Sequence, residues 1–241
     1  MNALTKILAV AAVGWSGVLP GATPEEEADA LWAEPRTAER IIKSVKTCEA
    51  ALAKGPDADL LWRAARGAAW LARHGPEKER RAQAERGVAF AKDAARASPA
   101  KPEGYFYYGM TLGLLSRIDQ TSRYIDRIER VGKKLIEIDE KYGYGGGDRL
   151  VGLIYLNTYS YPFVGAGSLK EAEAHLRRAC ELFPDYGYNQ LSHAKALLDQ
   201  DKKAEARRAL EKVIASKPAP GESEDHAQWV AEAKQLLREN R

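Results

Sequence analysis

Apolar residues recur along this 241-residue chain at the spacing of α-helix faces, and proline or glycine separates one periodic stretch from the next. Between about 37 and 54, the apolar side chains share one face of a 3.6-residue period: Ile41, Val45, Cys48 and Leu52. Similar stretches cover 57–73 and the residues leading to Pro99, and no useful length alternates as a strand would. The pattern therefore predicts an all-α protein.

A longer repeat is superimposed on the helical period. Pro184 and Pro218 stand 34 residues apart, and the same offsets before them hold small or bulky apolar residues: Ala172, Leu176 and Ala179, then Ala206, Leu210 and Val213. This period and these packing positions are typical of the tetratricopeptide (TPR) helix-turn-helix repeat. One helix pair cannot bury its own apolar face, so pairs must stack. We therefore predict a TPR-like α-solenoid of about four helix pairs with flanking capping helices.

The predicted division of the chain follows the helix stops. Residues 23–56 form N-terminal capping helices, 57–218 the TPR-like repeats, and 219–241 a C-terminal capping helix with a polar outer face. The unit that ends at Pro184 is longer than a regular repeat, and we assign its excess to an insertion over 157–168.

Residues 1–22 have the features of a secretory signal peptide. Lys6 gives a basic start, an apolar run of about a dozen residues follows, and small residues end it. The run is too short to span a bilayer. A buried first helix is the alternative. We expect a periplasmic or secreted protein with no stable membrane insertion after signal cleavage.

Composition and motifs argue against catalysis and nucleic-acid binding. The 37 basic and 34 acidic residues leave a formal charge of +3, which is no nucleic-acid footprint. The four histidines lack metal-ligand spacing, and no GxSxG or P-loop occurs. We expect no enzyme, no metal and no cofactor. We interpret Gly145–Gly147 as a helix start that needs positive φ and close packing. We also expect Cys48 and Cys180 to be free thiols in the core.

Tyrosine gives the clearest functional signal. All eleven tyrosines lie between Tyr105 and Tyr188, where first helices should line a concave face. Tyrosine combines apolar area with a hydroxyl and is common in binding sites. The candidate ligand- or partner-binding residues are Tyr105, Tyr108, Arg149, Tyr155, Tyr159, Tyr161, Tyr188 and Asn189. The alternative is that half or more of the tyrosines only fill core positions.

Three candidates, Tyr105, Arg149 and Asn189, come from successive units and are expected to face one cavity, with the insertion as a lid. Replacing Arg149 or Asn189 by Ala should then abolish binding with little change in melting. Gly152→Leu should unfold its unit, because a small residue is needed where two helices cross.

The stretch from 143 to 200 also resembles the TatT family, the T component of periplasmic TRAP transporters. The matching elements are Gly146-Gly147, Arg149, Val151-Gly152, Tyr155, Pro162, Gly167-Ser168, Pro184-Asp185-Tyr186 and Asn189. The resemblance implies a binding protein that associates with a periplasmic solute receptor, a small hydrophobic ligand, or both. A homo-oligomer stays open, as does the alternative of a general cell-envelope scaffold that binds a peptide or protein partner.

Overall fold

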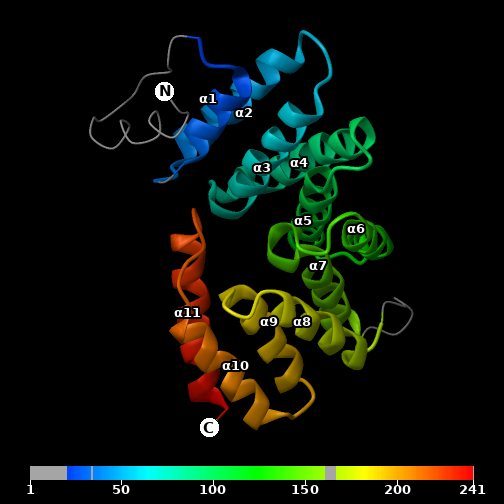
Figure 1. The fold of residues 1–241 in the computed structure, drawn as a ribbon, viewed down its shortest axis with the longest axis vertical. Helices are drawn as coiled ribbons and strands as arrows, with labels where there is room; N and C mark the ends of the chain where they lie inside the picture. The colour runs from blue at the N-terminus through cyan, green and yellow to red at the C-terminus, as the bar shows by residue number, and fades with distance from the viewer. Residues whose placement is uncertain (1–20, 34, 161–166, 241) are drawn as a thin grey trace, which may run out of the picture.

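The computed structural model describes residues 21–33, 35–160 and 167–240, and all regular structure in these ranges is helical (Figure 1). The helices are α1 (Pro24–Trp32), α2 (Ala38–Leu52), α3 (Ala58–His74), α4 (Glu77–Ala97), α5 (Pro102–Ile118), α6 (Ile125–Ile138), α7 (Tyr142–Thr158), α8 (Leu169–Leu182), α9 (Gly187–Leu198), α10 (Lys203–Ala215) and α11 (Ser223–Glu239). The prediction of an all-α, TPR-like solenoid is confirmed.

Local sequence signals explain where several helices begin. Thr23 caps α1 and Ser168 caps α8, each in a reciprocal capping box with the glutamate three residues later. Asp57 caps α3 by accepting hydrogen bonds from the backbone N–H groups of Asp59 and Leu60. These caps satisfy donors that the first helical turn leaves without partners.

The helices stack as antiparallel pairs, and the first helix of each pair lines the inside of the curve. Each helix packs against the next, and in addition α1, α3, α5, α7, α9 and α11 contact one another in that order. Within the described residues, the second helices have no such contacts with one another. Figure 1 shows the resulting bend, which brings α11 back toward the α1–α3 end. Residues of the first helices therefore form the inner face.

Small residues stand where helices cross closely, as the repeat pattern predicts. A Cβ atom on Gly152 would lie 2.6 Å from Leu176 Cγ of the partner helix α8. Cys48 and Cys180 are buried in the core and free, which confirms the expectation for both. Burial raises the pKa of Cys48 to about 11 and of Cys180 to about 12, so both thiols should react slowly.

Two predicted features fall largely outside the described residues. The signal peptide lies there except for its last two residues, and so do Tyr161 and the central part of the insertion, 161–166. In the part of the chain that the structure describes, no helix has both the length and the apolar character needed to cross a membrane.

Candidate binding site on the inner face

A line of aromatic rings crosses the inner face from one first helix to the next. Trp62 of α3 stacks on Tyr107 of α5, with ring centroids 6.1 Å apart and planes 3° from parallel. The neighbouring Phe106 meets Tyr142, at the start of α7, edge to face at 5.4 Å. Each contact joins helices from successive units, so side chains of different repeats form one continuous surface.

The line continues through the C-terminal units. Tyr144 stacks on Tyr186 at 4.4 Å, and Tyr188 stacks on Trp229 of α11 at 5.0 Å. We call the whole set the inner aromatic face: Trp32, Trp62, Phe106, Tyr107, Tyr142, Tyr144, Tyr186, Tyr188 and Trp229. Most of these rings are only half-buried. They leave apolar area and hydroxyl groups available to a partner.

Arginines are part of this surface at its N-terminal end. The Arg66 guanidinium lies between two rings, 4.5 Å from the centroid of Trp32 and 5.0 Å from that of Trp62. Asp29 of α1 accepts hydrogen bonds from Arg63 and Arg66. Burial by itself would raise the pKa of Asp29. The hydrogen bonds from the two arginines lower this pKa by a larger amount, so its net value is below that of an ordinary aspartate. The pairs hold α1 against α3.

Several polar atoms on this face are buried without a hydrogen-bond partner among the described residues. They are Arg66 Nε, Glu103 Oε2 and Glu222 Oε2. The same three side chains, with Arg36, are close enough to Tyr107 to perturb its hydroxyl. Burial raises the pKa of Tyr107 to about 12, so this hydroxyl stays protonated and can donate a hydrogen bond. The inner face therefore offers donors and acceptors beside its rings.

The structure brings Arg149 and Asn189 together, as expected. Both side chains, however, donate hydrogen bonds to backbone carbonyls at the start of α7. Arg149 Nη1 donates to Asn189 Oδ1 at 2.8 Å and to the Tyr144 carbonyl at 3.0 Å, and Nη2 donates to the Gly143 carbonyl at 2.9 Å. Asn189 Nδ2 donates to the Tyr144 carbonyl at 3.0 Å. Binding by these two residues stays a prediction, but an unchanged melting transition no longer follows for their alanine variants.

These hydrogen bonds hold an unusual backbone. Gly143, Tyr144 and Gly145 are consecutive residues with φ of 60°, 59° and 74°. Tyrosine pays about 1–2 kcal/mol in this left-handed region, so the surrounding bonds must enforce it. Within the glycine triplet only Gly145 needs positive φ, whereas close packing accounts for the other two: a Cβ would lie 2.6 Å from Phe106 at Gly146 and from Ile136 at Gly147.

The other predicted residues lie in different environments. Tyr105 and Tyr108 pack in a core cluster with residues of α4 and α6. Tyr155 is in the core, and its hydroxyl donates to Glu129 Oε1 at 2.7 Å. Tyr159 is exposed at the end of α7. Of the predicted tyrosines in the described residues, Tyr188 belongs to the inner aromatic face.

Sequence reasoning missed most of that face. Trp32, Trp62 and Trp229 lie outside the tyrosine-rich window, and Tyr107 and Tyr186 were not among the candidate binding residues. The available signal was helical phase: Trp62 and Arg66 are four residues apart on the first helix of a pair, and so share one side of it.

The ends of the solenoid meet at a seam between α3 and α11. Arg73 Nη2 lies 2.8 Å from Asp225 Oδ1, and Arg36 Nη1 donates to the Gly221 carbonyl. His74 Nε2 lies 3.5 Å from Asp225 Oδ1. A pocket of about 420 Å³ opens there, lined by Pro35, Arg36, Trp70, His74 and Gly221–Asp225. These side-chain contacts link the two ends of the curved array.

We expect Asp225→Asn to open this seam. The Arg73–Asp225 pair is largely shielded from solvent, and its loss leaves an arginine without its carboxylate. The radius of gyration from small-angle scattering should rise, while circular dichroism shows unchanged helix content. Asp201→Asn, at a side chain that is 88% exposed, is the matched control and should change neither. An unchanged radius for Asp225→Asn would mean that the ion pair does not hold the two ends together.

The same pair predicts the direction of a pH effect. Burial by itself would raise the pKa of the Asp225 carboxyl. The neighbouring His74 and Arg73 lower this pKa by a larger amount, so its net value is below that of an ordinary aspartate. The pair therefore stabilises closure fully above the ordinary aspartate pKa of about 3.9. This stabilisation is lost as the pH falls through the lowered pKa, so acid should separate the two ends of the wild-type protein, toward the state of Asp225→Asn.

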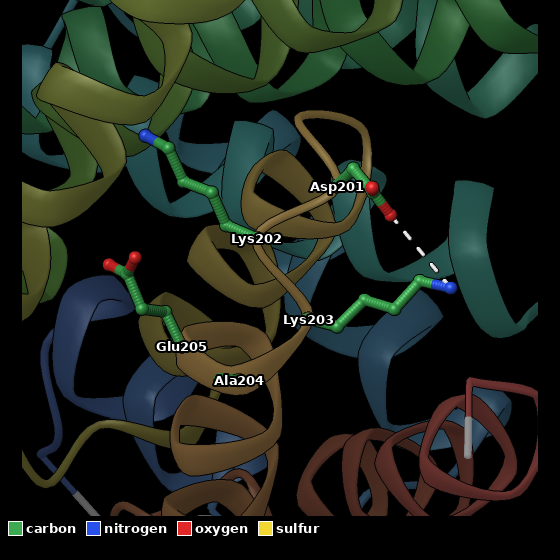
Figure 2. Close-up of a pocket in the computed structure, with 5 residues that line it drawn as sticks. All are labelled: Asp201, Lys202, Lys203, Ala204 and Glu205. Atoms are coloured by element: carbon green, nitrogen blue, oxygen red, sulfur yellow. Dashed lines mark ion pairs between the residues drawn. The ribbon is translucent and has the colours of Figure 1, made fainter.

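A second pocket, of about 320 Å³, surrounds the turn from Asp201 to Glu205 between α9 and α10. Figure 2 shows Asp201 directed toward Lys203, with 3.8 Å between the charged atoms, and Lys202 and Glu205 pointing elsewhere. Its lining is one short, mostly exposed stretch, so this pocket is no candidate site. Among the described residues, no group of three or more His, Cys, Asp and Glu side chains could hold a metal ion.

The class defined by this fold is that of TPR-like α-solenoids. The structure is similar to TTC0263, a thermophilic TPR protein of Thermus thermophilus, with 20% identity, a TM-score of 0.63, and coverage of 89% of this chain and 97% of that chain. Yeast Tom70 also matches, with 12% identity, a TM-score of 0.24, and coverage of 94% and 67%. No family model and no curated protein matches.

Proposed function

We propose that this chain is an exported binding protein that holds a segment of a protein partner against its inner aromatic face. The observation that carries the proposal is the line of aromatic rings, most of them half-buried, that runs from Trp32 to Trp229 through every first helix. Tryptophan, tyrosine and arginine are the residues most enriched at binding hot spots. Their continuity across repeats suits an elongated segment better than a compact solute.

The polar atoms beside the rings support a peptide as the occupant. A polypeptide presents N–H donors and carbonyl acceptors in alternation. Glu103 and Glu222 each have a carboxylate oxygen that could accept from such N–H groups, and Arg66 Nε could donate to a carbonyl. Pairing these buried atoms would remove the cost of leaving them unsatisfied.

The resemblance to the TatT family supports a more particular partner, a periplasmic solute receptor of a TRAP transporter, with a small hydrophobic ligand as a further occupant. The alternative is a general cell-envelope scaffold for peptides or proteins. The genes beside the coding sequence distinguish the two: a solute receptor and membrane permease there favour the transporter component, and their absence favours the general scaffold.

Binding to the purified receptor encoded nearby, measured by calorimetry, tests the site. Trp62→Ala and Tyr188→Ala should each weaken binding about 30-fold, the effect of losing a hot-spot anchor worth about 2 kcal/mol. Ile118→Ala, at an exposed apolar side chain outside the inner aromatic face, is the control and should bind like the wild type. Equal losses in all three variants, or none in the first two, would place the contact elsewhere.

Export has a separate test. The protein recovered from the periplasmic fraction should begin near Thr23, because signal peptidase cleaves after a small-residue exit such as the one before it. N-terminal sequencing or intact mass measures this. An intact Met1 in a soluble cytoplasmic fraction would contradict export but leave the inner-face proposal standing.

A further inference from the structure

The inner aromatic face repeats with the solenoid. One ring pair lies at each junction between successive first helices from α3 to α11: Trp62–Tyr107, Phe106–Tyr142, Tyr144–Tyr186 and Tyr188–Trp229. At least one ring of each pair is only half-buried, so every junction offers ring surface. The first helices contact one another in order along the inside of the curve (Figure 1). Because packed helices lie about 8–10 Å apart, an elongated partner meets a ring pair at about that interval.

This interval selects among the backbone conformations that a bound segment can adopt. A β-strand presents the same face every two residues, or about 6.6 Å, which falls short of the interval. One turn of α-helix, about 5.4 Å, also falls short, and two turns overshoot it at about 10.8 Å. A polyproline II helix presents the same face every three residues, and its rise of about 3.1 Å per residue makes that step about 9.3 Å. One turn of polyproline II therefore spans one junction.

Hydrogen bonding favours the same conformation. A polyproline II segment makes no internal hydrogen bonds, so all its backbone groups remain open to a partner. On the inner face, the hydroxyls of Tyr107 and Tyr142 form no hydrogen bond within the described chain. Burial raises the pKa of both tyrosines, so both hydroxyls stay protonated and can donate to carbonyls. With Arg66 Nε, these donors outnumber the unpaired acceptors, Glu103 Oε2 and Glu222 Oε2. This excess suits proline, which has a carbonyl but no N–H.

The charges on the inner face favour an uncharged segment. Around Tyr107, the guanidinium groups of Arg36 and Arg66 face the carboxylates of Glu103 and Glu222. The two signs are equal in number, so neither a basic nor an acidic partner gains from the field of the face as a whole. Apolar contact with the rings and hydrogen bonds to the backbone must then supply the affinity.

We propose that the inner aromatic face binds an uncharged proline-rich segment in the polyproline II conformation, with a proline at every third position. This inference rests on the proposed function, binding of a protein segment at this face, and names the chemistry of that segment. The proline rings pack on the half-buried aromatic rings, and their fixed φ reduces the entropy that the segment loses on binding. About twelve residues cover the four junctions from Trp62 to Trp229.

Calorimetry on the full chain with three peptides of twelve residues tests the conformation and the step. The first is four repeats of Pro-Ala-Gln, the second has the same composition with prolines at every second position, and the third has alanine in place of each proline. The first should bind at least about tenfold more tightly than the others, because the second is out of step and the third lacks the stiff backbone. Equal binding of the second would overturn the three-residue step, and equal binding of the third would overturn polyproline II recognition.

Two tyrosine variants locate the contact. Tyr107→Phe removes only a hydroxyl and should weaken binding of the first peptide about fivefold, the loss of one neutral hydrogen bond. Tyr124→Phe makes the same change directly before α6, outside the inner aromatic face, and should bind like the wild type. Melting curves will show that both variants are folded. Equal binding by both variants would overturn the contact of the Tyr107 hydroxyl with the segment.

The two proposals can fail separately. If the purified receptor binds the wild type and loses affinity with Trp62→Ala, but the proline peptide does not bind, this inference is wrong and the proposed function stands. If the proline peptide binds the wild type and loses affinity with Trp62→Ala, this inference stands even where the receptor does not bind.

Discussion

Gly104→Ala should destabilise the solenoid by about 3 kcal/mol, the upper end of the usual cost of overpacking. A Cβ atom at this position of α5 would lie 2.5 Å from the Ala95 nitrogen, 2.8 Å from Ala95 Cα and 2.9 Å from the Ala94 carbonyl carbon. All three atoms belong to the backbone of α4, so no side chain can rotate away. The two helices must move apart, and the contacts between their units weaken.

Gly113→Ala, in the same helix, is the matched control. Nothing lies within 4 Å of the Cβ that it would add, so only helix propensity changes. Alanine should then stabilise α5 by about 0.5–1 kcal/mol. Urea denaturation followed by circular dichroism measures the free energy of unfolding of both variants. We expect this free energy to fall for Gly104→Ala and to rise for Gly113→Ala. Equal stability would show that α4 and α5 separate at little cost.

Arg149→Ala should cost about 3 kcal/mol, the upper end of the cost of leaving buried acceptors without a donor. The side chain is 6% exposed and donates to Asn189 and to the carbonyls of Gly143 and Tyr144. Its removal leaves these acceptors in a dry site and releases a left-handed stretch that is costly for Tyr144. The start of α7 should lose its geometry.

Arg207→Ala removes the same side chain at a surface position, where its ion pair with Glu211 is exposed. It should change stability by less than about 1 kcal/mol. Arg149→Lys separates charge from shape: one ammonium cannot reproduce the guanidinium's separate donors, so most of the loss should remain. If Arg149→Ala melts at the same temperature as Arg207→Ala, Arg149 does not stabilise the fold, and only its predicted role in binding remains.

The helices and their stacking could be predicted from sequence because both depend on short-range signals. The 3.6-residue apolar period, the caps at Thr23 and Ser168, and the small residues at crossings such as Gly152 all act within a few turns or one repeat. The two buried, unpaired cysteines followed from the same reasoning.

The functional surface depended on the tertiary structure. The pattern marks Tyr107 and Tyr186 as residues of first helices, but their stacking partners Trp62 and Tyr144 come from neighbouring units. Arg149 was chosen because it lies on a first helix. Its burial and its bond to Asn189, 40 residues away, follow from how α7 packs against α9.

The seam is the clearest case of this kind. Its contacts join residues 152 and 185 positions apart, and they form only because small rotations between successive repeats add up to a curve that brings the two ends together. A local pattern fixes each helix but not the sum of these rotations. The sequence alone therefore determined an all-α solenoid of stacked pairs, whereas the tertiary structure decided that its ends meet and which side chains share its inner face.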